Sequence, residues 1–418
     1  MTTEEPQAPK QLHATPIVYG YFVLLMTLEL APVSLSATPL KYISKEQLHL
    51  DAQAAATLAA FVAIPGYFAF ALGLIRDRFN PLKMGDRGYL LIFGCVIGLI
   101  FLVISQVPLT LRSLGFCLFL VAASHMLVRA AYQALMRNIS EARLMSGRMS
   151  TTYQFMTTAI PMLGTLAGGW LTDHEISWRT ILIGVGLGFL CLGLFGTWKP
   201  AAVFEGLAPT PATSSAEFWR EVKALAKRKA FWIAAVIWGL WAFSPGANTP
   251  IYYYMTTTLK MSQFQYSVYD GLTTITLVPT VLLFGLLIKR YSLWSLVLTA
   301  TFVAIPQMIP LMLIHNAGQA YAAATFMGLT GGLATAAFWS LVIRASPQGL
   351  AGTGMLMAIS FGSLSVRGSD ILGGWIFKHW GFSGCAIVTT IAYLFLIPLM
   401  FMLPRALVRP HDDETIGV

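Results

Sequence analysis

Charged residues are scarce in this chain, and their scarcity excludes an ordinary soluble domain. Only 11% of the residues are Asp, Glu, Lys or Arg, and 56% are hydrophobic. Soluble globular domains carry about 25% charged residues. We therefore expect an integral membrane protein whose spans are helices, because a helix satisfies its own backbone hydrogen bonds in lipid.

Cysteine pairs and catalytic motifs are also missing. The four cysteines lie far apart in apolar stretches, at Cys95, Cys117, Cys191 and Cys385. They are best read as small hydrophobic residues of the membrane interior. There is no phosphate-binding loop, no metal-ligand spacing and no nucleophile elbow. We therefore expect no enzyme activity, no cofactor and no bound metal, with an ion gradient as the energy source.

A cleavable signal peptide is absent as well, because the first 15 residues are polar and the first apolar run is long enough to remain as a span. About 20 apolar residues cross a bilayer as a helix. By this measure we predict twelve spans, at 16–40, 52–75, 88–107, 112–135, 148–171, 179–198, 230–257, 264–288, 292–315, 318–343, 349–377 and 382–404.

A long polar break at 199–229 divides these spans into six and six. Its first part is rich in Pro, Ala, Ser and Thr, and we expect a flexible linker that ends in a basic amphipathic helix. The predicted units are an N-tail (1–15), an N-terminal six-helix bundle (16–198), the linker (199–229), a C-terminal six-helix bundle (230–404) and a C-tail (405–418).

The basic residues favour one orientation. With both termini in the cytoplasm, the cytoplasmic segments hold 19 Lys and Arg, the external segments hold six and the spans hold two, out of 27 in the chain. This is the positive-inside distribution. We predict an inner (plasma) membrane protein with cytoplasmic termini. The net charge of +9 then reflects topology rather than a nucleic-acid partner.

An internal repeat supports the division into halves. The stretch GGWLTDH at 168–174 recurs as GGWIFKH at 373–379, which is 205 residues later. LGLIRDRF at 72–79 similarly matches FGLLIKRY at 284–291, and AAYQAL at 130–135 matches AAFWSL at 336–341. Parallel repeats of six spans, with a site between them near the middle of the membrane, form a recurring transporter architecture. Chance similarity among small and aromatic residues is the alternative.

These features resemble the major facilitator superfamily over essentially the whole chain. The loop after span 2 matches the family's motif at Gly73, Asp77 and Arg78, but departs from it at Asn80, Pro81 and Leu82. The resemblance implies a gating role for Asp77 and Arg78. It also covers the span-4 motif Arg129-x-x-x-Gln133 and the span-5 packing motif from Pro161 to Gly169.

A finer resemblance is to the folate–biopterin and pigment-transporter branch, which includes PucC-like proteins, with muropeptide and siderophore permeases as neighbours. It rests on the stretches GLIRDRFNPLKMGDRGYLL, PGANTPIYYYMTTTLKMS and SPQGLAGTGMLMAIS. The chain departs from this branch at Gly88, where a second basic residue is usual, and at Ala351, where an acid is usual.

Few ionisable residues lie deep in the predicted spans, and they predict the mechanism. They are Glu29, His125, Arg129, Arg367 and Asp370. Such residues are costly in lipid and usually face a cavity or a partner. We predict that Glu29 and Arg129 pair in the empty site, that an anionic solute displaces Glu29 from Arg129, and that Glu29 then takes up a proton. A purely structural pair is the alternative.

Other residues are assigned by position. His125, Arg129 and Gln133 share one helix face, and His125 is a structural histidine, a proton carrier or a substrate contact. Arg367 and Asp370 pair locally or form a gate. Pro245, Gly246 and Pro250 should break span 7. Predicted substrate contacts there and in span 10 are Trp241, Asn248, Tyr252 and Trp339, with lipid-facing anchoring as the alternative.

We therefore predict a secondary transporter that takes up a small organic, anionic and partly aromatic solute together with a proton. It should act as a monomer in the lipid bilayer, with sodium as the alternative coupling ion. Proton-coupled efflux and a non-transporting membrane assembly factor are the alternative functions.

Overall fold

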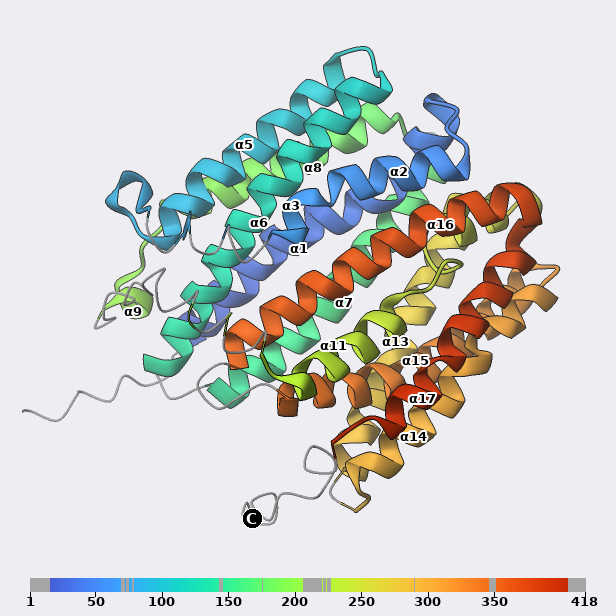
Figure 1. The fold of residues 1–418 in the computed structure, drawn as a ribbon. Coiled ribbons are helices and arrows are strands. Elements are labelled where there is room, and N and C mark those ends of the chain that lie inside the picture. Colours follow the sequence, from blue (N-terminus) through green and yellow to red (C-terminus); the bar gives the residue numbers. More distant parts are fainter. Residues whose placement is uncertain are drawn as a thin grey trace, which may run out of the picture.

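A computed structural model of the chain describes residues 16–68, 72, 75–76, 79–142, 146–174, 176–205, 220, 223, 227–288, 290–345 and 351–404. These residues form helices and connecting turns, with no strand among them. The predicted all-helical membrane fold is confirmed, and the helices lie side by side as long rods (Figure 1). The predicted surface helix at the end of the linker lies largely outside the described residues.

The N-terminal half begins with α1 (Pro16–Tyr42), which continues as a π-helical turn, η1 (Ile43–Gln47). Its other helices follow the predicted spans 2 to 6. They are α2 (Ala52–Val62), α3 (Ile64–Tyr67), α5 (Asp86–Gln106), α6 (Leu111–Ala142), α7 (Ser146–Asp173) and α8 (Trp178–Phe195). A short helix, α9 (Ala201–Phe204), starts the linker.

The C-terminal half begins with α11 (Lys229–Ala242) and α12 (Thr249–Tyr253), which together correspond to span 7. The predicted break is confirmed, since the chain leaves the helix around Pro245 and Gly246 and resumes it next to Pro250. The remaining elements are η3 (Tyr254–Thr258), α13 (Gln263–Leu287), α14 (Leu293–Ala304), η4 (Ile305–Leu313), α15 (Ala317–Ala345), α16 (Ala351–Leu394) and α17 (Leu396–Phe401).

Eight helical stretches of the described residues are long and apolar enough to cross a membrane, and the shorter apolar helices Ala52–Val62 and Lys229–Ala242 add to them. One of the eight, Met357–Phe401, holds two predicted spans. At 45 residues and 1.5 Å per residue it would be about twice the thickness of a bilayer core. It turns back at Gly381, whose positive φ of 66° is accessible to glycine at little cost.

Each half has its own hydrophobic core. One core is built from α1, α5, α6 and α8, with large buried side chains such as Phe22, Tyr132 and Phe189. The other half contains one core around α11, α14 and α15. A second core around α12 and α13 also takes in Ala52 and Ala55 of α2, so it crosses between the halves.

The halves meet through α7 against α13 and through α2 against α16. The hydrogen bonds and ion pairs that join two described residues of different halves all lie at one end of the bundle, opposite the start of α1 and the end of α17 (Figure 1). We call this the sealed end. It comprises residues 38–53, 169–174, 253–267 and 374–379.

Candidate functional site

A cavity of about 450 Å³ lies between the two halves. Helices α2, α3 and α6 line it from one half, and α11 and α16 line it from the other. Among the described residues that line it, Arg367 is the one that is charged, and Trp238 and Ser363 add polar atoms. The remaining lining residues are small or apolar: Ala59, Val62, Ala63, Gly66, Ala122, Met126, Ala242, Ile359, Gly362 and Val366.

A buried acid lies inside the N-terminal half. Glu29 of α1 is 1% exposed, and its Oε1 lies 2.9 Å from His125 Nε2 of α6. The other carboxylate oxygen, Oε2, has no hydrogen-bond partner among the described residues. His125 also packs edge-on against Phe189. Helix α6 thus carries His125 towards Glu29 and Phe189 of its own half, and it carries Ala122 and Met126 to the cavity lining.

The predicted ion pair between Glu29 and Arg129 is wrong. Arg129 lies one turn beyond His125 on α6, its side chain is exposed, and it forms no ion pair with any described residue. His125 and Arg129 lie one turn apart on the same face of α6, so only one of them can lie level with Glu29. The structure places His125 there. Gln133, a further turn along, donates from Nε2 to the Tyr153 hydroxyl at 3.4 Å.

The predicted local ion pair of Arg367 and Asp370 is present, and Asp370 also has a second partner in Thr249. Its carboxylate accepts hydrogen bonds from the backbone N–H and the hydroxyl of Thr249, both at 2.9 Å. It therefore caps α12 where the chain resumes the helix after the break. Arg367 Nη1 lies 3.9 Å from Asp370 Oδ2, which is beyond hydrogen-bonding distance. Most donors of the Arg367 guanidinium are therefore available to a ligand in the cavity.

The aromatic residues of span 7 divide between the cavity and the protein core. Trp241 donates to the Thr335 hydroxyl at 3.3 Å and packs against Tyr393, so it belongs to the C-terminal core. Trp238, which was not among the predicted substrate contacts, lines the cavity. Its ring lies 4.7 Å from the ring of Trp339 between centroids, and its Nε1 has no hydrogen-bond partner among the described residues.

Two further predicted contacts lie away from the cavity lining. Tyr252 is buried, and its hydroxyl donates to Gln263 Oε1 at 3.0 Å at the sealed end. Asn248 is half-buried and directly precedes α12. A direct role for either of them in solute binding stays a prediction.

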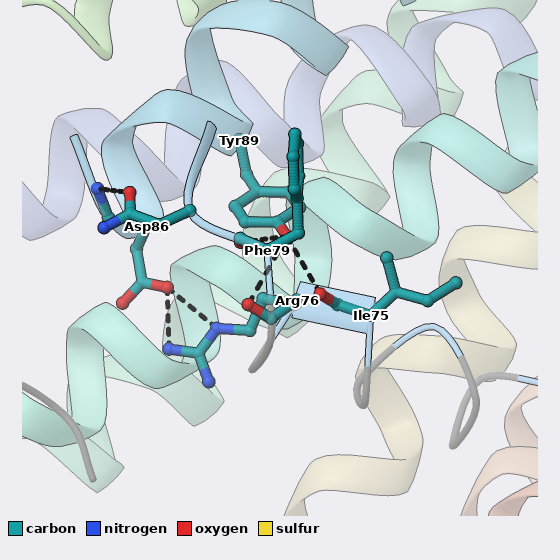
Figure 2. A network of polar contacts seen from close by, with 7 residues as sticks. Ile75, Arg76, Phe79, Asp86 and Tyr89 are labelled. Carbon is teal, nitrogen blue, oxygen red and sulfur yellow. Dashed lines mark hydrogen bonds and ion pairs between the residues drawn. The ribbon is translucent and has the colours of Figure 1, made fainter. Parts of the chain in front are cut away.

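The loop after span 2 is held by a polar network (Figure 2). Arg76 Nε donates to Asp86 Oδ1 at 2.8 Å, and the Tyr89 hydroxyl donates to the Phe79 carbonyl oxygen at 2.6 Å. The residues to which the family resemblance assigns gating, Asp77 and Arg78, lie outside the described residues. This network is the described part of the same loop.

The departure from the branch pattern at Gly88 has a structural reason. The backbone of Pro81 packs directly against Gly88, and a methyl group there would lie 3.2 Å from the Pro81 Cγ and in collision with its carbonyl oxygen. A basic side chain at this position is therefore incompatible with the conformation of the loop.

Two half-buried ionisable residues within helices were not among the predicted site residues. Lys41, assigned to an external segment, is still in α1 and donates from Nζ to the Tyr266 hydroxyl of the other half at 2.8 Å. Asp270 lies within α13, close enough to interact electrostatically with Lys41. Counting charges within α13 would have found Asp270, whereas Lys41 required knowing where α1 ends.

Comparison with known proteins agrees with this architecture. A sequence model of the Major Facilitator Superfamily matches residues 20–366. A search of curated protein sequences found no significant match.

Several solved structures share the fold. The nucleoside transporter NupG (D323A mutant) has a TM-score of 0.71 at 14% identity over 94% of this chain and 100% of that chain. A POT family transporter in complex with a thioalcohol-conjugated peptide has a TM-score of 0.72 at 14% identity, over 96% and 99%. A D-xylose–proton symporter has a TM-score of 0.65 at 13% identity, over 91% and 96%. The family match covers most of the chain, and this multi-pass membrane protein belongs to the Major Facilitator Superfamily of transporters.

Proposed function

We propose that this protein is a proton-coupled symporter that takes up a small organic anion with an aromatic portion. The observation that carries the proposal is the combination of a buried Glu29–His125 pair, held between α1 and α6, with a cavity that α6 also lines and in which Arg367 is the one charged residue among the described lining residues. The first element suits proton binding, and the second suits an anion.

The proton side of the proposal follows from the cost of charge in the membrane. A single charge at the centre of a bilayer costs about 2.5–3.5 kcal/mol or more, so Glu29 favours either a charged partner or a proton. Paired with a protonated His125, the carboxylate is neutralised. One additional proton gives the pair a net positive charge, which an anion in the neighbouring cavity offsets. Proton and anion therefore favour each other's binding.

The anion side follows from Arg367. A guanidinium binds a carboxylate through two parallel hydrogen bonds, and Asp370 already uses its oxygens on Thr249. The Trp238 ring offers a flat surface for an aromatic group. The remaining lining is small and apolar, which suits a compact organic solute better than a sugar that needs many hydrogen bonds.

The side of the membrane that the sealed end faces follows from the topology. If the segments rich in Lys and Arg face the cytoplasm, the sealed end faces the outside of an inner membrane. The conformation is then one in which the cavity is closed to the outside. One of the structural neighbours is by name a proton symporter, and the shared fold is compatible with that mode of coupling.

A ligand screen tests the proposal. The purified protein is heated with pterins, folates, siderophores and peptidoglycan fragments, because a bound compound raises the melting temperature by mass action. We expect an aromatic carboxylate, with pterin-6-carboxylate as the first probe, to stabilise the wild type but not Arg367→Ala. Arg129→Ala is the matched control, because the sequence alone favours that arginine. Equal stabilisation of wild type and Arg367→Ala would contradict the assignment.

A further inference from the structure

The two copies of the repeated motif place their sixth residues at equivalent points of the sealed end. These residues are Asp173, at the end of α7, and Lys378, in α16, 205 positions apart. Each reaches the start of the helix that forms the second span of the opposite half. Those helices also correspond to each other, since α2 begins at Ala52 and α13 begins at Gln263.

Asp173 caps a helix of the other half. Its two carboxylate oxygens accept hydrogen bonds from the backbone N–H groups of Gln263 and Phe264, at 2.9 Å and 2.8 Å. The Ser262 hydroxyl accepts from the Gln265 N–H. Helix starts leave four N–H groups without helical partners and favour negative charge. A residue of the N-terminal half therefore completes the start of α13.

Lys378 makes the equivalent contact with the charges reversed. Asp51 is the N-cap of α2, and its Oδ1 accepts from the Ala54 N–H at 2.8 Å. Its other oxygen lies 2.8 Å from Lys378 Nζ. Asp51 and Ser262 are thus corresponding N-caps. We call these two contacts between the halves the clasps. In the clasp between Asp173 and the start of α13, the motif residue supplies the carboxylate. In the clasp between Lys378 and Asp51, the motif residue binds the carboxylate of the N-cap.

The glycines of the motif explain why the halves come this close. A methyl group on Gly169 would lie 2.8 Å from the Gln263 carbonyl oxygen, and one on Gly374 would lie 2.8 Å from the Gln53 Cα. Both contacts cross between the halves. The preceding glycines, Gly168 and Gly373, instead face α1 and Pro245 of their own halves.

The Trp and His of the motif brace the same helix turn. Trp170 and His174 stack with ring centroids 4.1 Å apart, and Trp375 and His379 lie 4.7 Å apart. Each His Nδ1 also lies within hydrogen-bonding distance of the carbonyl oxygen of its Trp. The turn that carries the sixth residue is therefore fixed in both copies.

We propose that Asp173 and Lys378 are positioning residues of the transport cycle, which hold the sealed end closed through two pseudo-symmetric clasps. Opening of this end separates α7 from α13 and α2 from α16, and both clasps break together. The inference requires only that the halves move, and it depends on the proposed function solely for the side of the membrane that the sealed end faces.

Cysteine labelling tests the clasps without a known solute. The four native cysteines are replaced, and Ser267→Cys introduces a single new one. Ser267 is fully buried at the sealed end. The new cysteine is labelled with a membrane-impermeant maleimide at pH 7. Losing an N-cap side chain shifts a conformational equilibrium by about 2- to 30-fold. We expect Asp173→Ala to accelerate labelling by such a factor. Arg179→Gln, an exposed change at the same end that touches neither clasp, should leave the rate unchanged.

The second clasp allows a sharper comparison. Asp51→Ser removes the charge but keeps a residue that can cap α2, as Ser262 does for α13, and Lys378→Met removes the cation. An exposed ion pair contributes about 1.4- to 5-fold. We expect each variant to accelerate labelling by this smaller factor, and the double variant to add nothing further. Additive effects would contradict a shared contact.

The outcome separates gating from mere stability. Faster labelling with an unchanged melting temperature supports the clasps, whereas a lower melting temperature with unchanged labelling from either side would overturn them. Acceleration from the cytoplasmic side alone would support the clasps and refute the topology in the proposed function.

Discussion

Replacing His125 with Ala should leave the buried Glu29 carboxylate without its partner, and the cost in unfolding free energy follows from the structure. Glu29 is 1% exposed, and its Oε1 has His125 Nε2 as its partner at 2.9 Å. Removing one member of a buried pair costs about 3–5 kcal/mol, because the remaining charge is uncompensated. The protein can limit this cost by protonating the glutamate. Protonating an ordinary glutamate at pH 7 costs about 3.7 kcal/mol, from 1.36 kcal/mol for each unit above 4.3.

This limit makes the penalty depend on pH. At pH 5 the same protonation costs about 1 kcal/mol, so the destabilisation of His125→Ala should shrink as the pH falls. For a cooperative unit the size of one half, 3.7 kcal/mol corresponds to a melting temperature lower by about 7–15 °C. We expect that difference from wild type at pH 7 and only a few degrees at pH 5.

The matched control removes the charge as well. In the double variant with Glu29→Gln no carboxylate remains, so most of the lost stability should return at pH 7 and the pH dependence should disappear. Thermal unfolding of the purified wild type, His125→Ala and double variant, followed by tryptophan fluorescence at both pH values, measures these differences. A penalty that is the same at pH 5 and pH 7, or one that Glu29→Gln fails to relieve, would refute the reasoning.

Three other changes have defined outcomes. Gly169→Ala should push the halves apart and accelerate labelling at the sealed end, whereas Gly168→Ala, which faces its own half, should lower the melting temperature; identical behaviour would contradict the division of roles. The hydrogen bond from Lys378 lowers the pKa of Asp51, so this clasp should hold above the ordinary aspartate range and fail as the pH falls through the lowered value. Distances between spin labels on the two halves should therefore lengthen in strong acid, and a pH dependence that persists in Asp51→Ser would count against this origin. Asp370→Ala should cost about 1–3 kcal/mol of unfolding free energy by leaving the N–H that begins α12 unpaired, and an unchanged melting temperature would argue against the cap.

Much of the fold could be predicted because its determinants are local. Apolar length sets the spans, and Pro245, Gly246 and Pro250 break span 7 by the chemistry of their own backbones. The duplication was visible in the two GGW stretches. The structure adds the reason for the repeat. In each copy the first glycine packs against its own half, and the second glycine packs against the opposite half.

The partners within the site could not be predicted in the same way. His125 and Arg129 lie one turn apart on one face of α6, and which of them meets Glu29 depends on the depth and rotation of α6 against α1. The same applies to Trp238 and Trp241 beside the break in span 7. Helix periodicity identifies the face of a helix, but tertiary packing decides which turn of that face reaches the partner.

Coupling is tested most directly in proteoliposomes with the compound that the ligand screen identifies. Wild-type protein should accumulate that compound above its external concentration when an inward proton gradient is imposed. Glu29→Gln should only exchange it down its own gradient, while still binding it with wild-type affinity. Concentrative uptake by Glu29→Gln equal to that of the wild type would contradict the role of the Glu29–His125 pair in carrying the proton.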